Sequence, residues 1–148
     1  MTDSLKHRPM EVALMPHAAK LRVAQAQMKQ MPQVFIPVRH FIGHGMCTRV
    51  MFAPAGTAII GKRHLQGQHN FLLVGSIRLI GDEGDTVLHA PEVIVSPPGT
   101  KRAAVAITDV VWATTIVTEL TDPEDIERTV IDPEDLDDAP RVEQGEQS

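Results

Sequence analysis

The residues whose types could do chemistry are cationic and polar side chains in the middle of the chain. Lys62 and His64 stand two positions apart in a β-branched, apolar stretch, so a strand there would place both on one face. An ammonium and an imidazole on one face can bind a carboxylate or phosphate, and an imidazole can also ligate a metal. The single cysteine, Cys47, excludes an internal disulfide and a paired-cysteine zinc site, and its surroundings indicate a buried side chain rather than a nucleophile.

The elements that must position these residues are short strands. Residues 34–118 consist of β-branched, apolar runs separated by turn residues, a rhythm that predicts an all-β sandwich or barrel. The predicted strands are Val34–Val38, Thr48–Phe52, Thr57–Lys62, His69–Val74, Ile77–Ile80, Thr86–Leu88, Glu92–Val95, Ala103–Ile107 and Val110–Thr118.

Helical segments are predicted on both sides of the strands. Residues 17–31 carry apolar residues at helical spacing between Pro16 and Pro32, and this stripe must cover the barrel or a second subunit. The tetrapeptide Asp-Pro-Glu-Asp begins at Asp122 and again at Asp132, which predicts two short capped helical turns. The expected organisation is an N-terminal arm and helix (1–33), a barrel (34–118), acidic helical turns (119–136) and a disordered acidic tail (137–148).

Charge is divided unevenly along the chain, whose formal net charge is −5. Residues 119–148 hold 12 acidic and 2 basic residues, so the basic excess lies in residues 1–118. A basic barrel favours an anionic ligand, whereas the tail is interpreted as a solubilising segment. No apolar run approaches the roughly 20 residues of a membrane span, and the start lacks a secretory stretch, so the expected location is the cytoplasm.

The stretch from Gly56 to Arg102 resembles the two-part signature of the cupin superfamily, G-x5-H-x-H-x(3,4)-E-x6-G followed by G-x5-P-x-G-x2-H-x3-N. At those spacings this chain carries Gly56, Lys62, His64, Gln68 and Gly75, and then Pro91, Pro97, Gly99, Arg102 and Ala106. The resemblance implies an all-β fold, namely a single cupin-like jelly-roll β-barrel with an N-terminal helix and short C-terminal helical turns.

The same resemblance implies a divalent metal held by two histidines, a glutamate and a third histidine, but only His64 keeps its ligand type. A metal ion would be repelled by an ammonium and a guanidinium, so we expect a degenerate metal site and no cofactor. The leading interpretation is a protein, non-enzymatic or weakly enzymatic, that binds a small anionic molecule. Its predicted ligand-binding residues are Lys62, His64, Gln68, Asn70 and Arg102, with Arg49 and Trp112 lining the same cavity. The alternative that Lys62 and Arg102 extend into solvent stays open.

A rebuilt metal site is a second interpretation. A one-residue bulge could turn His69 inward beside His64, which would give a metal-dependent cupin enzyme of the isomerase or dioxygenase type. Strand alternation argues against it, because Gln68 and Asn70 would share one face and His69 the other. His40, His44 and His89 are further candidate metal ligands, although a surface or structural role is favoured for each.

The stretch from Arg39 to Trp112 is also similar to small cupin-like proteins encoded in bacteriophage genomes, through Pro54-Ala-Gly, Ile60-Gly-Lys and Ser96-Pro-Pro-Gly-Thr-Lys-Arg. This likeness implies a phage or prophage origin with action in the host cytoplasm. It leaves a third interpretation, a phage structural or host-interaction protein whose helix and acidic tail contact partners.

The expected partners follow from what the chain lacks and what its size requires. Nucleic acid is not an expected partner, because there is no tyrosine and the four phenylalanines stand in apolar, strand-like contexts. No membrane partner is expected. A homo-oligomer, by default a dimer, is expected because small barrels commonly cover an edge by pairing.

Overall fold

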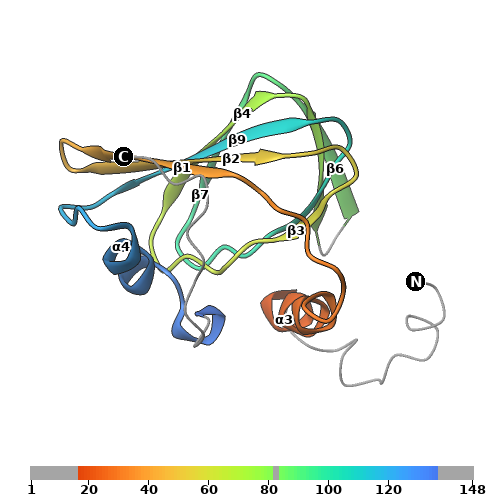
Figure 1. The fold of residues 1–148 in the computed structure, drawn as a ribbon, viewed down its shortest axis with the longest axis horizontal. Coiled ribbons are helices and arrows are strands. Elements are labelled where there is room, and N and C mark those ends of the chain that lie inside the picture. Colours follow the sequence, from red (N-terminus) through yellow and green to blue (C-terminus); the bar gives the residue numbers. More distant parts are fainter. Residues whose placement is uncertain (1–16, 82–83, 137–148) are drawn as a thin grey trace.

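The computed structural model describes residues 17–81 and 84–136, which form two β-sheets with helices at one end (Figure 1). Helix α3 (His17–Met28) precedes the strands, and helix α4 (Pro123–Val130) and the 3-10 helix η1 (Pro133–Asp135) follow them. The strands are β1 (Val38–Gly43), β2 (Met46–Ala53), β3 (Ala58–Ile60), β4 (Gln68–Val74), β5 (Ser76–Gly81), β6 (Gly84–His89), β7 (Glu92–Ser96), β8 (Ala103–Ala106) and β9 (Val110–Val117). The predicted disordered tail, 137–148, lies outside the described residues.

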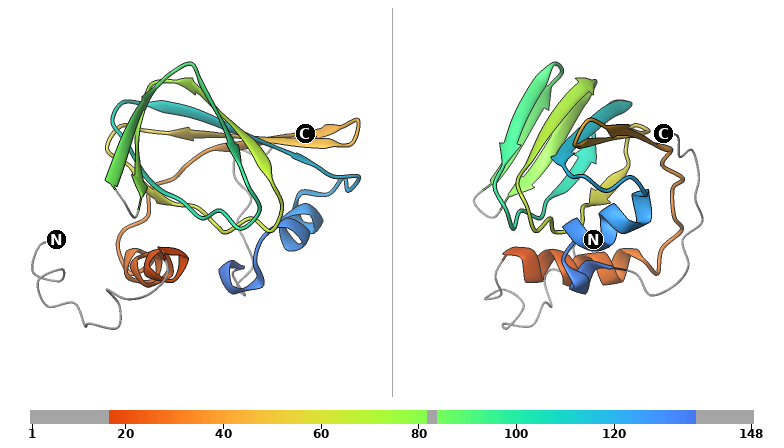
Figure 2. Two further views of the ribbon diagram at one scale, coloured as in Figure 1. Left: turned by 180° about the vertical axis from the view of Figure 1, so that it is seen from behind. Right: turned by 90° about the vertical axis from the view of Figure 1, so that its left-hand side faces the viewer.

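The described strands pair in the orders β1-β2-β9-β4-β7 and β3-β8-β5-β6. All the pairings are antiparallel, and several join strands far apart in sequence, such as β2 with β9 and β3 with β8. The two sheets face each other as the walls of a barrel, and α3 and α4 lie on the same side of it in all the views (Figures 1 and 2). This jelly-roll arrangement confirms the predicted all-β barrel with an N-terminal helix and C-terminal helical turns.

The prediction for the first strand is wrong in position. The chain over residues 34–37 is irregular, and β1 begins only at Val38 and continues through the polar residues Arg39 and His40. The sequence-based prediction missed the hairpin that joins β1 to β2. Gly43 pairs with Met46, and the two loop residues, His44 and Gly45, have φ values of 54° and 77°. Positive φ at both positions is what a type I′ hairpin turn requires, and His-Gly is a less familiar sequence for it than Asn-Gly.

Two glycines of the signature have a backbone reason for their identity. Gly75, in the turn from β4 to β5, has a φ of 90°, and a Cβ there would clash with the carbonyl oxygen of Asp109. Gly99 has a φ of 88° in the turn before β8. Both positions lie in the left-handed region of backbone conformation, which residues with a Cβ adopt only with steric strain. These two glycines of the signature therefore mark turns between strands of the barrel.

Buried ion pairs attach the helices to the end of the barrel. The Arg22 guanidinium of α3 contacts Asp132 and Asp135 at 2.9 and 3.0 Å, and the Lys101 ammonium lies 2.9 Å from Asp135. The side chains of Lys101 and Asp135 are 0% and 2% exposed. We call Arg22, Arg63, Lys101, Asp132 and Asp135 the ion network. Leu21 of α3 is buried at this end of the barrel, whereas Met31, also part of the predicted apolar stripe, is 61% exposed.

The second Asp-Pro-Glu-Asp repeat supplies the acidic half of this network. The first repeat caps α4 as predicted, because the Asp122 carboxylate accepts a hydrogen bond from the Asp125 backbone. The second forms η1, in which Asp132 accepts from the Glu134 backbone while also contacting Arg22 and Arg63. The first copy of the repeat thus caps a helix, and the second copy also forms buried ion pairs that hold the helices to the barrel.

Apolar side chains gather at two places. The inner cluster lies between the sheets and comprises Ala53, Leu72, Ile77, Ala104, Ala106 and Val110. The helix-side cluster joins α4 to the sheet and comprises Cys47, Ile116, Ile126, Val130 and Ile131. Burial raises the pKa of the Cys47 thiol, which keeps it protonated, in agreement with a packing role. No helix in the described ranges is long and apolar enough to cross a membrane.

Candidate functional site

A cavity of about 880 Å³ lies between the two sheets and beneath α4. Segment 33–36 and the β3–β4 connection complete its wall. Members of both apolar clusters line it, including Ala104 and Ile126. The structure brings all of the predicted ligand-binding residues to this cavity, namely Lys62, His64, Gln68, Asn70, Arg102, Arg49 and Trp112.

A polar row crosses the inner face of the five-stranded sheet. Arg49 of β2 pairs with Thr114 of β9, which pairs with Asn70 of β4. The Thr114 hydroxyl donates to Asn70 Oδ1 at 2.8 Å, and Asn70 Nδ2 donates to Ser96 Oγ at 2.8 Å. Ser96 is 1% exposed at the end of β7. The Asn70 amide is therefore held in one orientation by two bonds.

Arg102 adds a cation to this row from the opposite sheet. Its Nη1 donates to Ser96 Oγ at 2.6 Å. Ser96 therefore orients both the Arg102 guanidinium and the Asn70 amide. Arg102 is half-buried, and burial alone lowers its pKa, with no acidic group opposing the shift. Among the described residues no carboxylate lies within ion-pairing distance of it. An arginine keeps its charge in proteins, so the cavity contains a partly desolvated positive charge without a counter-ion from this part of the chain.

Gln68 lies beside this cation and has an unmet hydrogen bond. It pairs in register with Ser96 and is 8% exposed. Its Oε1 atom is buried and has no hydrogen-bond partner in the described part of the chain. A buried polar atom without a partner costs about 1–3 kcal/mol.

Lys62 is balanced by an acid that the sequence did not point to. Its Nζ lies 3.3 Å from Glu127 Oε1, and both side chains are largely buried. Glu127 comes from α4, whose place over the cavity depends on packing of Ile126 and Val130 rather than on a motif. The charge of Lys62 is therefore paired, and that of Arg102 is not paired within the described residues.

His64 stands as a neutral imidazole between these groups. Burial is the largest cause that lowers its pKa; the charge of Arg49 lowers it further, while the bond to the Lys62 carbonyl and Glu127 oppose the shift. Its Nδ1 lies 3.1 Å from the Lys62 carbonyl oxygen, which can only accept, so Nδ1 carries the proton. Nε2 is then the atom with a free lone pair.

The ion network holds the loop that carries these two residues. Arg63, between Lys62 and His64, donates its backbone N–H to Asp135 at 2.7 Å and its side chain to Asp132 at 2.9 Å. Its side chain also donates to the Gly99 carbonyl oxygen at 3.2 Å. Fixing Arg63 outward leaves its two neighbours to line the cavity, which is how the second acidic repeat contributes to the site.

The residues at the signature's metal positions do not fit a divalent ion. Lys62 and Arg102 offer no lone pair, which leaves His64 and the neutral amide of Gln68 as donors. The structure does not bring His69 to His64, because His69 is exposed on the outer face of β4, as alternation predicts. Within residues 17–81 and 84–136 no group of three His, Cys, Asp or Glu side chains could hold a metal. The remaining histidine candidates are scattered: His40 lines the cavity, His44 lies in the hairpin turn, and His89 contacts Ser76 at 2.7 Å.

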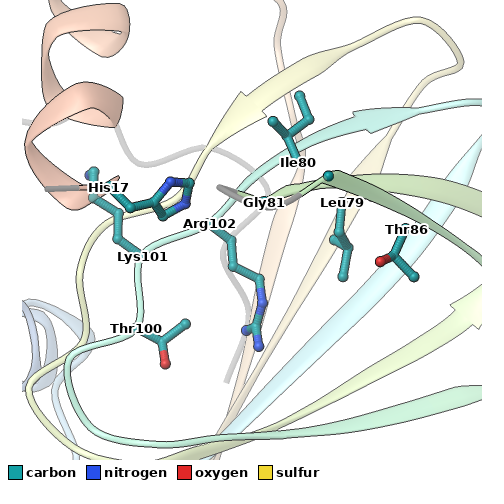
Figure 3. A pocket seen from close by; sticks show the side chains of 9 residues that line it. His17, Leu79, Ile80, Gly81, Thr86, Thr100, Lys101 and Arg102 are labelled. Carbon is teal, nitrogen blue, oxygen red and sulfur yellow. The ribbon is translucent and has the colours of Figure 1, made fainter. Parts of the chain in front are cut away.

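A second pocket, of about 270 Å³, lies between the N-terminus of α3, residues 100–102 and the hairpin ends of β5 and β6. Figure 3 shows Lys101 on the side of α3 and His17, whereas the guanidinium of Arg102 extends away from them. Adjacent residues thus have separate roles. Lys101 belongs to the ion network, and Arg102, which borders both pockets, serves the cavity.

Sequence reasoning missed Ser96, Thr114 and Glu127. Ser96 and Thr114 could have been found, because strand alternation places Thr114 on the face of Trp112, and Ser96 directly follows a predicted strand. No signal in the sequence marked Glu127, because nothing local says where α4 packs.

No protein-family model and no curated protein matches the sequence. Solved structures do match it. A cupin superfamily protein from Desulfitobacterium hafniense matches with a TM-score of 0.50 and 9% identity, over 60% of this chain and 82% of that one. A Salmonella typhimurium protein named for ethanolamine utilization matches with a TM-score of 0.50 and 12% identity, over 59% and 72%. The phage origin that the sequence suggested is not supported by these matches.

Identities this low establish a shared fold and leave the ligand open. The sheet orders, the glycines of the signature turns and the structural matches agree with one another. This chain is therefore a protein of the cupin fold, a jelly roll of two antiparallel sheets with a helix before and a helix after the strands.

Proposed function

We propose that this chain binds a small anionic molecule inside the barrel, with Arg102 as the residue that receives the anionic group. The observation that carries the proposal is the half-buried Arg102 guanidinium, which has no carboxylate partner in the described chain and one hydrogen bond, to Ser96. A ligand anion would supply the missing counter-charge.

The surroundings of Arg102 favour a bound anion over an empty cation. Because Ser96 engages only Nη1, the guanidinium keeps further N–H donors for a planar carboxylate or a phosphate. The guanidinium is already oriented by Ser96, so little side-chain entropy is lost when a ligand binds.

The test compares two substitutions of the same kind. Arg102→Gln removes the charge in the cavity, and Arg78→Gln removes an exposed charge from β5. Unfolding temperature is measured in inorganic phosphate and in butanoate against sodium chloride of equal ionic strength. Calorimetric titration then gives the dissociation constants.

We expect the anions to raise the unfolding temperature of the wild type and of Arg78→Gln. For Arg102→Gln the dissociation constant should be at least tenfold larger, because a charged hydrogen bond contributes about 1.5–3 kcal/mol. Circular dichroism checks that the variant is folded, and Arg102→Lys, which keeps the charge without the fork, should fall between the two. If the wild type responds to the anions no more than to chloride, or if Arg102→Gln responds like the wild type, the proposal is refuted.

A further inference from the structure

The cavity continues past the polar row into an apolar region. One step along the same sheet from Arg49, Thr114 and Asn70, the paired residues are Met51, Trp112 and Leu72. The facing sheet contributes Ile59, Ile77, Leu79 and Ala104 to the cavity wall. On this side of the row the cavity-lining side chains are therefore apolar.

This apolar region begins next to Arg102. Arg102 directly precedes β8, Ala104 is the second residue of that strand, and both line the cavity. Ala104 pairs with Leu79 on one side and with Ile59 on the other. Because alanine is small, the middle of this wall leaves space that its larger neighbours border.

The size of the cavity exceeds what an anionic group needs. A volume of about 880 Å³ lies near the upper end of the range of small-molecule sites, whereas a carboxylate or phosphate has only a few heavy atoms. An isolated inorganic anion at Arg102 would leave the apolar wall in contact with water. An apolar group joined to the anion would displace that water and gain the hydrophobic contribution of burial.

Resting on the proposed function, we propose that the ligand is a carboxylic acid with an apolar body, whose carboxylate binds Arg102 and whose body lies along Ala104, Leu79 and Trp112. A second charged group at the far end of the ligand would be buried against these apolar side chains and is excluded by them. The class is thus an amphiphilic monocarboxylate, of the kind represented by medium-chain fatty acids and aryl-alkanoic acids.

The chain contains a built-in reporter for this geometry. Trp112 is the only tryptophan of the sequence, and it lines the cavity next to Met51. A body that lies along Trp112 must change its fluorescence, whereas acetate bound at Arg102 would not extend that far. The emission spectrum therefore reports the position of the apolar body without any substitution.

The experiment titrates the full chain with acetate, butanoate, hexanoate and octanoate, and with three further probes matched to octanoate or to the anion. Octan-1-ol lacks the carboxylate, suberate adds a second one at the same length, and inorganic phosphate lacks a body. We expect affinity to rise about fourfold for each added methylene that is buried, since each contributes about 0.8 kcal/mol. Octanol and suberate should bind at least tenfold more weakly than octanoate, and only the longer acids should change Trp112 emission.

Substitutions locate the body. Ala104→Leu fills the apolar region and should weaken octanoate at least tenfold while leaving acetate unchanged. Ala58→Leu makes the same change at an exposed position of β3 and should alter neither. If Ala104→Leu does not fold, the wild-type length series and the Trp112 spectrum still decide the matter.

The failures of the two proposals are distinguishable. Binding of acetate or phosphate that depends on Arg102, with no gain along the acid series, overturns the amphiphilic ligand and leaves the proposed function standing. A gain along the series that Ala104→Leu does not reduce places the body elsewhere and also overturns the inference. Absence of any Arg102-dependent binding refutes the proposed function itself.

Discussion

Removing the carboxylate of Asp135 tests whether the ion network holds the barrel and its helices together. Asp135 is 6% exposed and accepts three hydrogen bonds, from the Arg63 backbone at 2.7 Å, from Lys101 Nζ at 2.9 Å and from Arg22 Nε at 3.0 Å. Burial alone would raise the pKa of Asp135, but these three donors bring it below its usual range, so the group is a buried anion. Among the described residues, Asp135→Ala leaves the buried Lys101 ammonium with the Gly61 carbonyl and the Gln25 amide oxygen as hydrogen-bond partners.

The expected magnitude follows from the kind of contact that is lost. Breaking a buried ion pair by removing one partner costs about 3–5 kcal/mol, because the other charge stays buried without compensation. We expect a loss of about 3 kcal/mol, near the lower end, since Lys101 keeps two neutral acceptors. A domain of this size has a free energy of unfolding of about 5–15 kcal/mol, so the loss is a large fraction of the total.

Urea unfolding followed by circular dichroism measures the free energy of unfolding of Asp135→Ala. Two further variants serve as controls. Arg128→Ala breaks an exposed pair with Glu124 at 3.8 Å and should change the free energy of unfolding by at most about 0.5 kcal/mol. The double variant Lys101→Met with Asp135→Leu removes both charges and should regain at least half of the loss. A change below about 1 kcal/mol for Asp135→Ala would show that the network does not anchor these elements, and the reasoning would be refuted.

Two more outcomes follow from the turns and from the buried imidazole. Gly75→Ala should lower the free energy of unfolding by about 3 kcal/mol, since φ is 90° and a Cβ would clash with the Asp109 carbonyl; an unfolding temperature unchanged from the wild type would contradict this. The folded pKa of His64 is lowered, so its protonation favours the unfolded chain; the stability present above the usual histidine pKa of 6.5 is therefore lost as pH falls below it. His64→Asn should flatten the dependence of unfolding temperature on pH between about 7.5 and 5, and an unaltered slope would show that another group titrates there.

Local patterns in the sequence determined the fold class and most of the strands. The period of two in β4 separated Gln68 and Asn70 from His69, because successive side chains of a strand point to opposite faces whatever surrounds them. The Asp-Pro pairs fixed the starts of α4 and η1, because a capping carboxylate and a proline act within one helical turn. Both signals act over a few residues, which is why they can be recognised without the structure.

Tertiary structure alone decided which charges are balanced. Lys62 and Arg102 are equally cationic in the sequence, yet only Lys62 finds a described acid at the cavity, and that acid, Glu127, comes from a helix 65 residues further along the chain. Lys101 and Arg102 are neighbours, yet one is neutralised by the ion network and the other lies in the cavity. The sequence by itself determined a cupin-like barrel with cations where metal ligands stand in the resembling family. Which cation lacks a counter-ion depends on how distant segments pack, since Coulomb energy depends on separation in space and on burial rather than on separation in sequence.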